Sequence, residues 1–261
     1  MNYSYSELAG MIDHALLHPT LTDQELLDGC QLCDRYGVAT VCVKPYHVKK
    51  ASEILSGSKT SVSCVIGFPH GSTTQESKSF ETRVACKKGA REVDMVANIG
   101  KAMSGDWQYV KEDITGVVSE AEKHGAKVKV IFETDYLTNG GAGLSRAELV
   151  SKLCEVSEEA GAHWVKTSTG FGFVRQPEGG FACVGAQVED IITMREACGK
   201  EVQVKASGGV RDLDSLVGFR NLGVTRCGTS ATQKILDEYK RLTGDITSNT
   251  NEKTEDSVSD Y

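Results

Sequence analysis

The sequence lacks the two features that would direct the protein to a membrane. No apolar run approaches the roughly 20 residues that a membrane-spanning helix needs. The first seven residues, Met1 to Glu7, have neither the basic start nor the apolar centre of a signal peptide. We therefore expect a cytoplasmic protein with no membrane partner.

An excess of positive charge is also missing. The chain has 29 lysines and arginines against 36 acidic residues, a formal charge of −7. Nucleic acids are bound by surfaces rich in lysine and arginine. We therefore expect no nucleic-acid partner, although a local basic pocket for a small anion is compatible with this charge.

The nine cysteines do not form a disulfide framework. Their number is odd, and Cys42, Cys64 and Cys227 lie inside apolar, strand-like runs, so we expect buried, reduced thiols. Cys30 and Cys33 form a C-x-x-C pair within a helical pattern, without the second pair that would complete a tetrahedral zinc site. We interpret that pair as packing and expect no metal.

Short apolar stretches alternate along the chain with capped helical patterns. Continuously apolar strands between helices are typical of a parallel sheet covered by helices. Eight such units in this length favour a single-domain α/β (β/α)₈ TIM barrel over an open doubly wound sheet. The predicted strands are 11–17, 38–44, 62–68, 92–97, 127–134, 162–170, 201–209 and 223–228, and the predicted helices are 22–36, 45–55, 73–88, 107–124, 145–160, 187–197, 212–220 and 229–241.

The composition changes near residue 244. We place the barrel at residues 1–243, followed by a flexible, polar and acidic tail at residues 244–261. The tail has too few apolar residues to fold alone. It ends on Tyr261, an aromatic side chain for which the tail offers no packing partner.

Two predicted strands carry a lysine among apolar residues near the C-terminal end. Lys166 is followed by Thr-Ser-Thr-Gly, and Lys205 by Ala-Ser-Gly-Gly. A strand is a costly place for lysine, because burial disfavours the charged amine. Neighbouring strands lie about 4.8 Å apart, so two such cations would repel each other and favour a neutral amine on one of them. A neutral amine is a nucleophile towards carbonyl groups, which predicts an imine-forming enzyme.

Other charged groups gather at the same end of the predicted barrel, where active sites of this fold lie. Asp94 lies within its strand, where it can pair with a lysine and also relay protons. Glu133 ends its own strand, and we expect it to pair with Lys44 or with solvent.

Two glycine-containing loops follow the seventh and eighth predicted strands. These are Gly208-Gly209 and Gly228-Thr229-Ser230, at the positions where barrels bind phosphate through backbone N–H groups. Gly170 offers a further N–H group. Arg211 and Arg226 either add positive charge to this site or are ordinary surface residues.

Four motifs together resemble the deoxyribose-phosphate aldolases. They are Val-Lys166-Thr-Ser-Thr-Gly, Val-Lys205-Ala-Ser-Gly-Gly-Val-Arg, Glu-Val-Asp94-Met-Val-Ala-Asn and Arg-Cys-Gly-Thr-Ser, and the likeness runs from Ile12 to the last predicted helix. The resemblance implies a class I aldolase on a (β/α)₈ barrel, with no metal or cofactor. It also implies reversible cleavage of 2-deoxy-D-ribose 5-phosphate to D-glyceraldehyde 3-phosphate and acetaldehyde.

The same resemblance assigns roles to individual residues. Lys166 would form the imine, Lys205 would lower its pKa, and Asp94 and Asp13 would belong to the proton-transfer network. Some family members end on a tyrosine that assists proton transfer, and Tyr261 matches it. His18-Pro19 departs from the Lys-Pro of many members. The residues that would bind the substrate and its phosphate are Thr169, Gly170, Ser207, Gly208, Gly209, Gly228, Thr229 and Ser230.

Two alternatives remain open at the level of sequence. One is another imine-forming sugar-phosphate aldolase or a transaldolase-like barrel, and the other is a barrel that binds a sugar phosphate without catalysis. Barrels often associate through their outer helices, so we expect a homo-oligomer and favour a dimer, although no single helix marks the interface.

Overall fold

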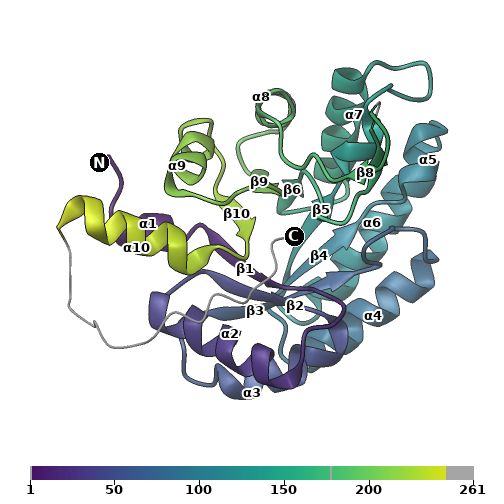
Figure 1. Ribbon diagram of the computed structural model, residues 1–261. Helices are drawn as coiled ribbons and strands as arrows, with labels where there is room; N and C mark the ends of the chain where they lie inside the picture. The colour runs from purple at the N-terminus through teal and green to yellow at the C-terminus, as the bar shows by residue number, and fades with distance from the viewer. Residues whose placement is uncertain (1, 177, 245–261) are drawn as a thin grey trace.

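The computed structural model describes residues 2–176 and 178–244, and this part of the chain contains a closed barrel of parallel strands (Figure 1). Neighbouring strands follow the order β1-β10-β9-β6-β5-β4-β3-β2. The predicted (β/α)₈ barrel is therefore confirmed. The barrel strands are β1 (Ile12–Leu16), β2 (Thr40–Val43), β3 (Ser61–Ile66), β4 (Glu92–Val96), β5 (Lys127–Ile131), β6 (Trp164–Lys166), β9 (Gln203–Ser207) and β10 (Arg226–Thr229).

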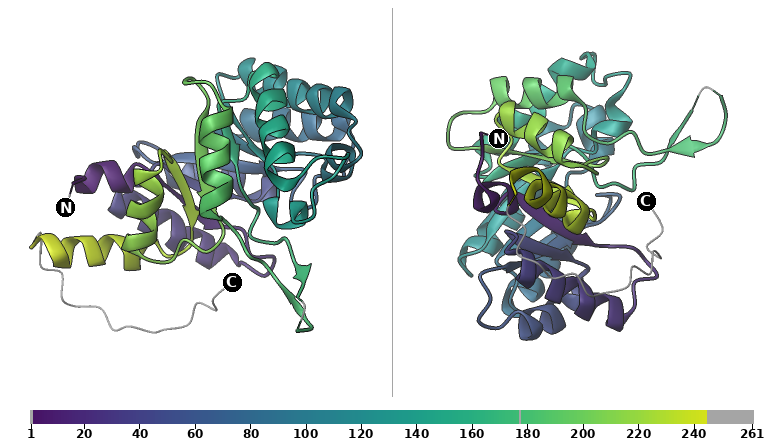
Figure 2. Two further views of the ribbon diagram at one scale, coloured as in Figure 1. Left: turned by 90° about the horizontal axis from the view of Figure 1, so that it is seen from above. Right: turned by 60° about the vertical axis from the view of Figure 1, so that its left-hand side comes forward.

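Helices cover the outside of the barrel, as Figures 1 and 2 show. The longer ones are α2 (Asp23–Tyr36), α3 (Val48–Ile54), α4 (Gln75–Lys87), α6 (Trp107–Glu122), α7 (Arg146–Glu159), α8 (Val188–Ala197), α9 (Leu213–Asn221) and α10 (Thr232–Thr243). Shorter elements are α1 (Tyr5–Ala9), α5 (Ile99–Met103) and the 3₁₀ turns η1 (Pro45–His47) and η2 (Thr134–Leu137). Within the two described ranges, no helix combines the length and the apolar character needed to cross a membrane.

The helix ends follow the local sequence signals. Thr22 and Ser145 form capping boxes at the starts of α2 and α7, and Gly37 ends α2 in the left-handed conformation. The predicted starts of two helices need correction. The helix expected from Thr229 begins only at Thr232, because Thr229 still belongs to β10, and the segment from Pro45 begins as a 3₁₀ turn.

The two faces of the barrel strands differ in polarity. Along β4, Val93 and Met95 belong to the apolar core between the sheet and the helices, whereas the alternate residues Glu92 and Asp94 form ion pairs inside the barrel. Side chains alternate between faces along a strand, so one face can be apolar while the other is charged. The centre of this barrel is therefore polar, and its large apolar core lies outside the sheet.

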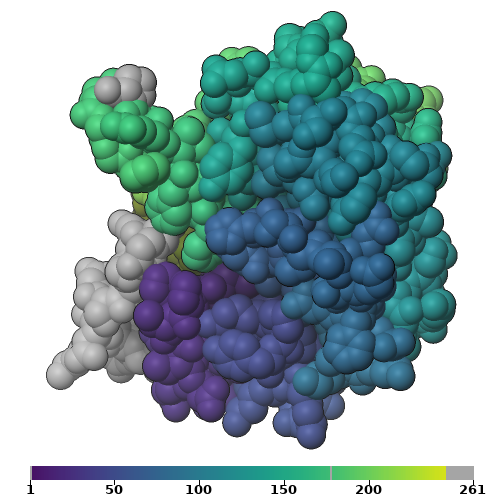
Figure 3. Space-filling view, turned by 90° about the vertical axis from the view of Figure 1, so that its right-hand side faces the viewer, coloured from purple at the N-terminus to yellow at the C-terminus, as the bar shows by residue number. Residues whose placement is uncertain are grey.

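A small hairpin that was not predicted interrupts the connection from β6 to α8. Its antiparallel strands are β7 (Val174–Arg175) and β8 (Phe181–Ala182). The hairpin projects away from the barrel (Figures 2 and 3), and Phe173 and Phe181 are exposed on it. The predicted acidic tail from residue 245 onward, including Tyr261, lies outside the described residues.

Candidate active site

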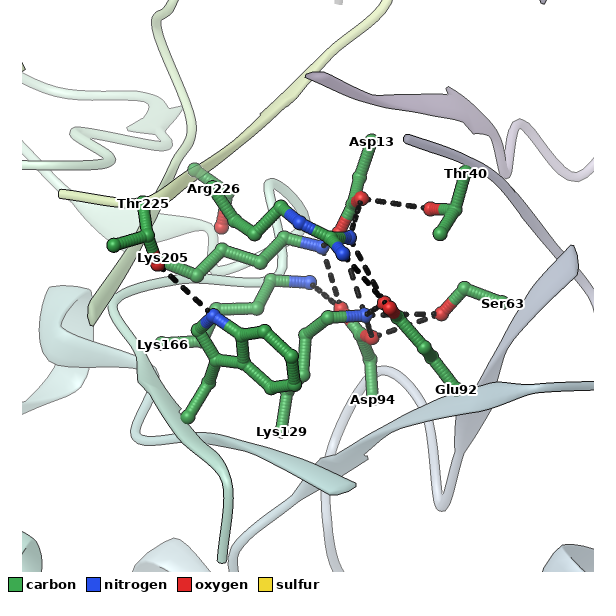
Figure 4. Close-up of polar contacts among 12 residues, drawn as sticks. Asp13, Thr40, Ser63, Glu92, Asp94, Lys129, Lys166, Lys205, Thr225 and Arg226 are labelled. Carbon is green, nitrogen blue, oxygen red and sulfur yellow. Dashed lines mark hydrogen bonds and ion pairs between the residues drawn. The ribbon is translucent and has the colours of Figure 1, made fainter. Parts of the chain in front are cut away.

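The two lysines singled out in the sequence lie side by side inside the barrel. Lys166 on β6 and Lys205 on β9 are register partners in adjacent parallel strands, and their exposed fractions are 3% and 1%. Both ammonium groups donate to the same oxygen, Asp94 Oδ2, at 2.9 Å from Lys166 Nζ and 2.7 Å from Lys205 Nζ (Figure 4). The predicted proximity of the two lysines is confirmed, and Asp94 is the carboxylate between them.

Asp13 holds Lys205 from the opposite side. Lys205 Nζ donates to Asp13 Oδ2 at 2.5 Å, while the Thr40 hydroxyl and Arg226 Nη1 donate to Asp13 Oδ1 at 2.7 and 2.6 Å. Asp13 is completely buried. It is therefore part of the same network as Asp94, as the resemblance implied.

A third lysine lies deeper in the barrel. Lys129 Nζ lies 2.7 Å from Asp94 Oδ1, 2.6 Å from Glu92 Oε2 and 3.3 Å from Asp13 Oδ2. Arg226 binds Glu92 through two hydrogen bonds of 2.9 and 2.8 Å. Arg226 is therefore not an ordinary surface residue: its positive charge belongs to the network inside the barrel, where it is bound to Asp13 and Glu92.

Lys129 and Glu92 were missed as site residues at the level of sequence. The signal was present in the alternation of β5, Lys127-Val-Lys129-Val, and of β4, Glu92-Val-Asp94. Alternation of this kind ordinarily indicates a strand with one face in water. Here the polar faces of both strands point into a closed barrel and neutralise each other.

The balance of charges in this network singles out Lys166. The four cationic groups are Lys129, Lys166, Lys205 and Arg226, and the three carboxylates are Asp13, Glu92 and Asp94 (Figure 4). Lys129 contacts all three carboxylates, and Lys205 and Arg226 contact two each. Lys166 contacts only Asp94, through an oxygen that it shares with Lys205. Lys166 is therefore the cation with the least compensation.

The pKa values follow from this geometry. Burial lowers the pKa of Lys166, and the Lys205 cation lowers it further, against the opposing effect of Asp94. Burial alone would also lower the pKa of Lys205, but Asp13 and Asp94 outweigh it and raise that pKa. Burial disfavours ionised Asp94, yet the three lysines hold its pKa well below the usual range. The site thus combines a lysine biased towards the neutral amine with a lysine that stays charged.

An apolar cluster lies at the same end of the barrel. It comprises Leu17, Cys42 and Val65 together with Ala15, Phe68 and Phe171, and the last two rings are in edge-to-face contact at 5.4 Å. Cys42 lies close enough to Lys166, Lys205 and Asp94 to interact with their charges, and burial raises the pKa of its thiol to about 11. Cys42 is therefore a buried, protonated thiol in the wall of this cluster, as expected from its place in an apolar strand.

The predicted glycine loops surround this end of the barrel. Gly170, Gly208 and Gly209 have φ angles of 84°, 86° and 81°, a region that favours glycine. Gly228 lies on β10, and a Cβ atom there would be 2.9 Å from Ser207 Cβ. Gly209 is exposed and the other three glycines are partly exposed, and the Cβ atom built on Gly228 would also lie 3.5 Å from Lys205 Cε. Accessible backbone N–H groups are a feature of anion sites.

Hydroxyl groups tie the same loops together. Thr167 and Ser207 exchange hydrogen bonds of 3.0 Å, and Ser207 Oγ donates to Ser168 O at 2.5 Å. Thr229 Oγ1 donates to Val210 O at 2.6 Å, and Ser230 is exposed. The hydroxyls of Thr169, Ser207 and Thr229 are buried and bind protein groups. In the rest of the predicted set, Ser230 and Gly209 are exposed, and Gly170, Gly208 and Gly228 are partly exposed.

Glu133 and Lys44 do not pair with each other, and that expectation was wrong. Glu133 is buried and binds the backbone N–H and hydroxyl of Thr169. Lys44 Nζ donates instead to His18 O at 2.5 Å, and His18 Nδ1 lies 2.6 Å from the Thr20 hydroxyl. Lys44, which directly follows β2, therefore binds the loop after β1, to which His18 belongs.

The cysteines carry no sign of metal chemistry. All nine are free thiols, and all but Cys183 are buried, in line with the expected reduced state. Burial raises the pKa of Cys30 to about 11. Among residues 2–176 and 178–244, no three histidines, cysteines or acidic residues are grouped in a way that could hold a metal ion.

Comparison with known proteins assigns the family. A model of the DeoC/LacD family aldolases matches residues 8–222. The chain belongs to this aldolase family. A curated deoxyribose-phosphate aldolase of Rhodopirellula baltica is 41% identical over 93% of each chain.

Solved structures of this aldolase family agree with the assignment. A proposed deoxyribose-phosphate aldolase from Coccidioides immitis superposes with a TM-score of 0.80 and 35% identity, covering 91% of this chain and 87% of that one. The deoxyribose phosphate aldolase of Aeropyrum pernix, described as a tetramer, has a TM-score of 0.78 and 28% identity, covering 92% and 93%.

Proposed function

We propose that this aldolase reversibly cleaves 2-deoxy-D-ribose 5-phosphate to D-glyceraldehyde 3-phosphate and acetaldehyde through an imine on Lys166. The observation that carries this proposal is the position of Lys166 as the least compensated cation of a buried network, with a lowered pKa. The names of its relatives supply the substrate. A buried amine that is neutral in part of the population near neutral pH is the nucleophile that imine formation requires.

In the proposed mechanism, formation of an imine precedes cleavage of the carbon–carbon bond, and hydrolysis follows. The neutral Lys166 amine attacks the aldehyde carbon of the open-chain sugar phosphate, and loss of water gives a protonated imine. The sugar hydroxyl next to the breaking bond loses its proton, the carbon–carbon bond electrons move toward the imine, and glyceraldehyde 3-phosphate leaves. The resulting enamine takes up a proton at carbon, and water then releases acetaldehyde and restores the amine.

The neighbouring residues have separate parts in this proposal. Lys205 keeps its charge and holds Asp94 in place, and Asp94 accepts and returns protons through a water molecule. Asp13 fixes Lys205 from behind. We also propose that the backbone around Gly170, Gly208, Gly209, Gly228 and Ser230 binds the phosphate.

Two further proposals come from the family resemblance. Tyr261 would assist proton transfer, as the C-terminal tyrosine of some family members does. We also propose an intracellular homo-oligomer. Its support is the tetramer described for the Aeropyrum pernix relative, and its size is open to measurement by light scattering.

A retro-aldol assay tests the function directly. Purified protein is incubated with 2-deoxyribose 5-phosphate, with and without a chelator, and the release of both aldehydes is followed. The same assay on other phosphorylated sugars distinguishes a different aldolase or a transaldolase. We expect aldehyde release from 2-deoxyribose 5-phosphate and from none of the other phosphorylated sugars, and the chelator should not change its rate. No release from any sugar phosphate would favour a barrel that binds without catalysis.

The imine is tested by reduction with borohydride in the presence of substrate. We expect inactivation and a single reduced adduct on the peptide that contains Lys166. Lys166→Met should show neither adduct nor activity. An adduct on Lys205 instead would contradict the assignment of the nucleophile.

A further inference from the structure

Glu133 fixes the start of the loop that follows β6, and the proposed mechanism does not use this residue. We call residues 168–186 the β6 loop. The backbone N–H of Thr169 donates to Glu133 Oε1 at 3.2 Å, and the Thr169 hydroxyl donates to Glu133 Oε2. The same hydroxyl accepts the backbone N–H of Phe171 at 2.9 Å. One carboxylate therefore fixes the turn that contains Gly170.

Asp135 ties the two ends of the β6 loop together. Its carboxylate accepts the Ser168 hydroxyl at 3.1 Å, the Val184 N–H at 2.8 Å and the Gly185 N–H at 3.0 Å. The end of the loop then lies against the glycine loop after β9. A Cβ atom on Gly185 would be only 2.6 Å from the carbonyl of Gly208. The loops after β5, β6 and β9 are thus held as one unit.

Glu133 occupies its place at a cost to stability. It is 1% exposed, and its backbone is in the left-handed region with φ 52°. That conformation and the burial of a carboxyl group are both unfavourable for a non-glycine residue. Such costs cluster at functional sites, where the surrounding structure imposes them.

The environment of Glu133 also affects its protonation. Burial raises the pKa of its carboxyl group to about 7, against the hydrogen bonds from Thr169. The titratable groups that influence or face it are Asp135 and Tyr136 of η2, Lys166 of β6 and Cys183 of the β6 loop. Burial therefore opposes ionisation of Glu133, whereas the two hydrogen bonds from Thr169 favour it.

We propose that Glu133 is a positioning residue that acts through Thr169 to place the backbone of Gly170 for the substrate's phosphate. This inference rests on the proposed function and adds a determinant of specificity to it. Glu133 touches neither the imine nor the reacting carbons in this proposal. Its loss therefore weakens the preference for phosphorylated over unphosphorylated 2-deoxyribose.

The experiment compares Glu133→Gln and Glu133→Ala with the wild type on 2-deoxyribose 5-phosphate and on 2-deoxyribose. Glu178→Gln is the matched control, because Glu178 is an exposed carboxylate in the same loop. We expect KM for the phosphorylated sugar to rise about tenfold in Glu133→Gln, because the variant lacks the hydrogen bonds that Thr169 makes to a charged carboxylate. The kcat value and the kinetics with 2-deoxyribose should stay within twofold of the wild type. Equal losses on both sugars, or an unchanged KM, would overturn the proposal.

Failure of the proposed function is distinguishable from failure of this inference. If the wild type does not cleave 2-deoxyribose 5-phosphate, the substrate assignment fails, and binding of inorganic phosphate then tests Glu133. Phosphate is titrated into the wild type and Glu133→Gln, and the melting temperature is recorded. A phosphate-dependent rise that is lost in the variant supports the positioning role. Equal rises in both proteins, or no rise in either, overturn it.

Discussion

At the scale of single residues, the chemistry depends on an unequal sharing of carboxylates among neighbouring cations. Lys205 contacts Asp13 and Asp94, whereas Lys166 shares one oxygen of Asp94. The two lysines lie in similar sequence motifs, yet their pKa values move in opposite directions. Burial and the Lys205 cation lower the pKa of Lys166, whereas Asp13 and Asp94 outweigh burial and raise the pKa of Lys205. Position within the network therefore distinguishes Lys166, the nucleophile that we propose, from Lys205.

Removing the Lys205 cation tests this division of roles. In Lys205→Met, the repulsion between Lys205 and Lys166 disappears, and Asp94 Oδ2 is left to Lys166 while Lys129 keeps Asp94 Oδ1. A nearby charge shifts a pKa by about 1–3 units. If the pKa of Lys166 rises by about 2 units in the variant, the fraction of Lys166 in the neutral amine form falls about 100-fold near neutral pH. We expect kcat/KM to fall by that order and its pH profile to move to higher pH. Lys200→Met, a change at an exposed lysine, is the control. An unmoved profile would show that Lys205 does not control Lys166.

At the scale of elements, the sequence was sufficient where signals are local. Capping boxes at Thr22 and Ser145, and the alternation of apolar strands with helices, predicted the barrel and the order of its elements. The pairing of Lys166 with Lys205 also followed, because both are near the C-terminal ends of consecutive barrel strands. These features depend on residues close together in the chain or on a regular repeat.

Contacts between distant segments could not be predicted in the same way. Lys129 is surrounded by carboxylates from β1 and β4, and only closure of the barrel brings these groups together. The fully buried ion pair of Lys78 and Asp113 joins α4 to α6 for the same reason. Each of these lysines alone is indistinguishable in sequence from a surface lysine.

The β6 loop gives a prediction at the scale of an element. The pKa of Glu133 is raised in the folded protein to about 7 from an ordinary 4.5. A carboxyl group with a raised pKa contributes stability below its unfolded pKa and loses it as the pH rises through the folded value. The wild type should therefore lose roughly 3 kcal/mol of unfolding free energy from this group between pH 4.5 and 7, at about 1.4 kcal/mol per pKa unit.

Urea unfolding of Glu133→Gln at pH 5 and pH 8 measures this contribution. The variant lacks the titrating group, so its stability relative to the wild type should be greater at pH 8 than at pH 5. Glu178→Gln should follow the wild type at both pH values. The same relative stability of Glu133→Gln at both pH values would show that Glu133 does not titrate in this range.

At the scale of the whole molecule, the centre of the barrel is charged, whereas the centre of most folded proteins is apolar. Apolar residues from both sheet and helices form the core outside the strands, and charged residues fill the centre. A polar network of this kind is stable only when each member has its partners. The reactivity that we propose for Lys166 and the integrity of the barrel should therefore depend on one network.

Lys129→Met is the substitution that tests this link. It removes the cation shared by Asp13, Glu92 and Asp94, and breaking a buried ion pair on one side costs about 3–5 kcal/mol. In the wild type, burial opposes ionisation of Asp13 and Asp94, but Lys129 and the other cations hold both pKa values below their ordinary range. Carboxylates with lowered pKa values contribute stability above the unfolded pKa and lose it as the pH falls through the folded value. The stability difference between wild type and variant should therefore be largest at neutral pH and shrink below about pH 4.

Unfolding by urea at pH 7 and pH 3.5 measures that difference, with Lys127→Met as the matched control. Lys127 lies two residues earlier on β5 but is exposed, so its loss should change stability by less than about 0.5 kcal/mol. Residual activity of Lys129→Met should also shift to higher pH, because the negative charge of Asp13 and Asp94 is then less compensated and favours the Lys166 ammonium. If both variants unfold like the wild type, the Lys129 cation does not hold the barrel together.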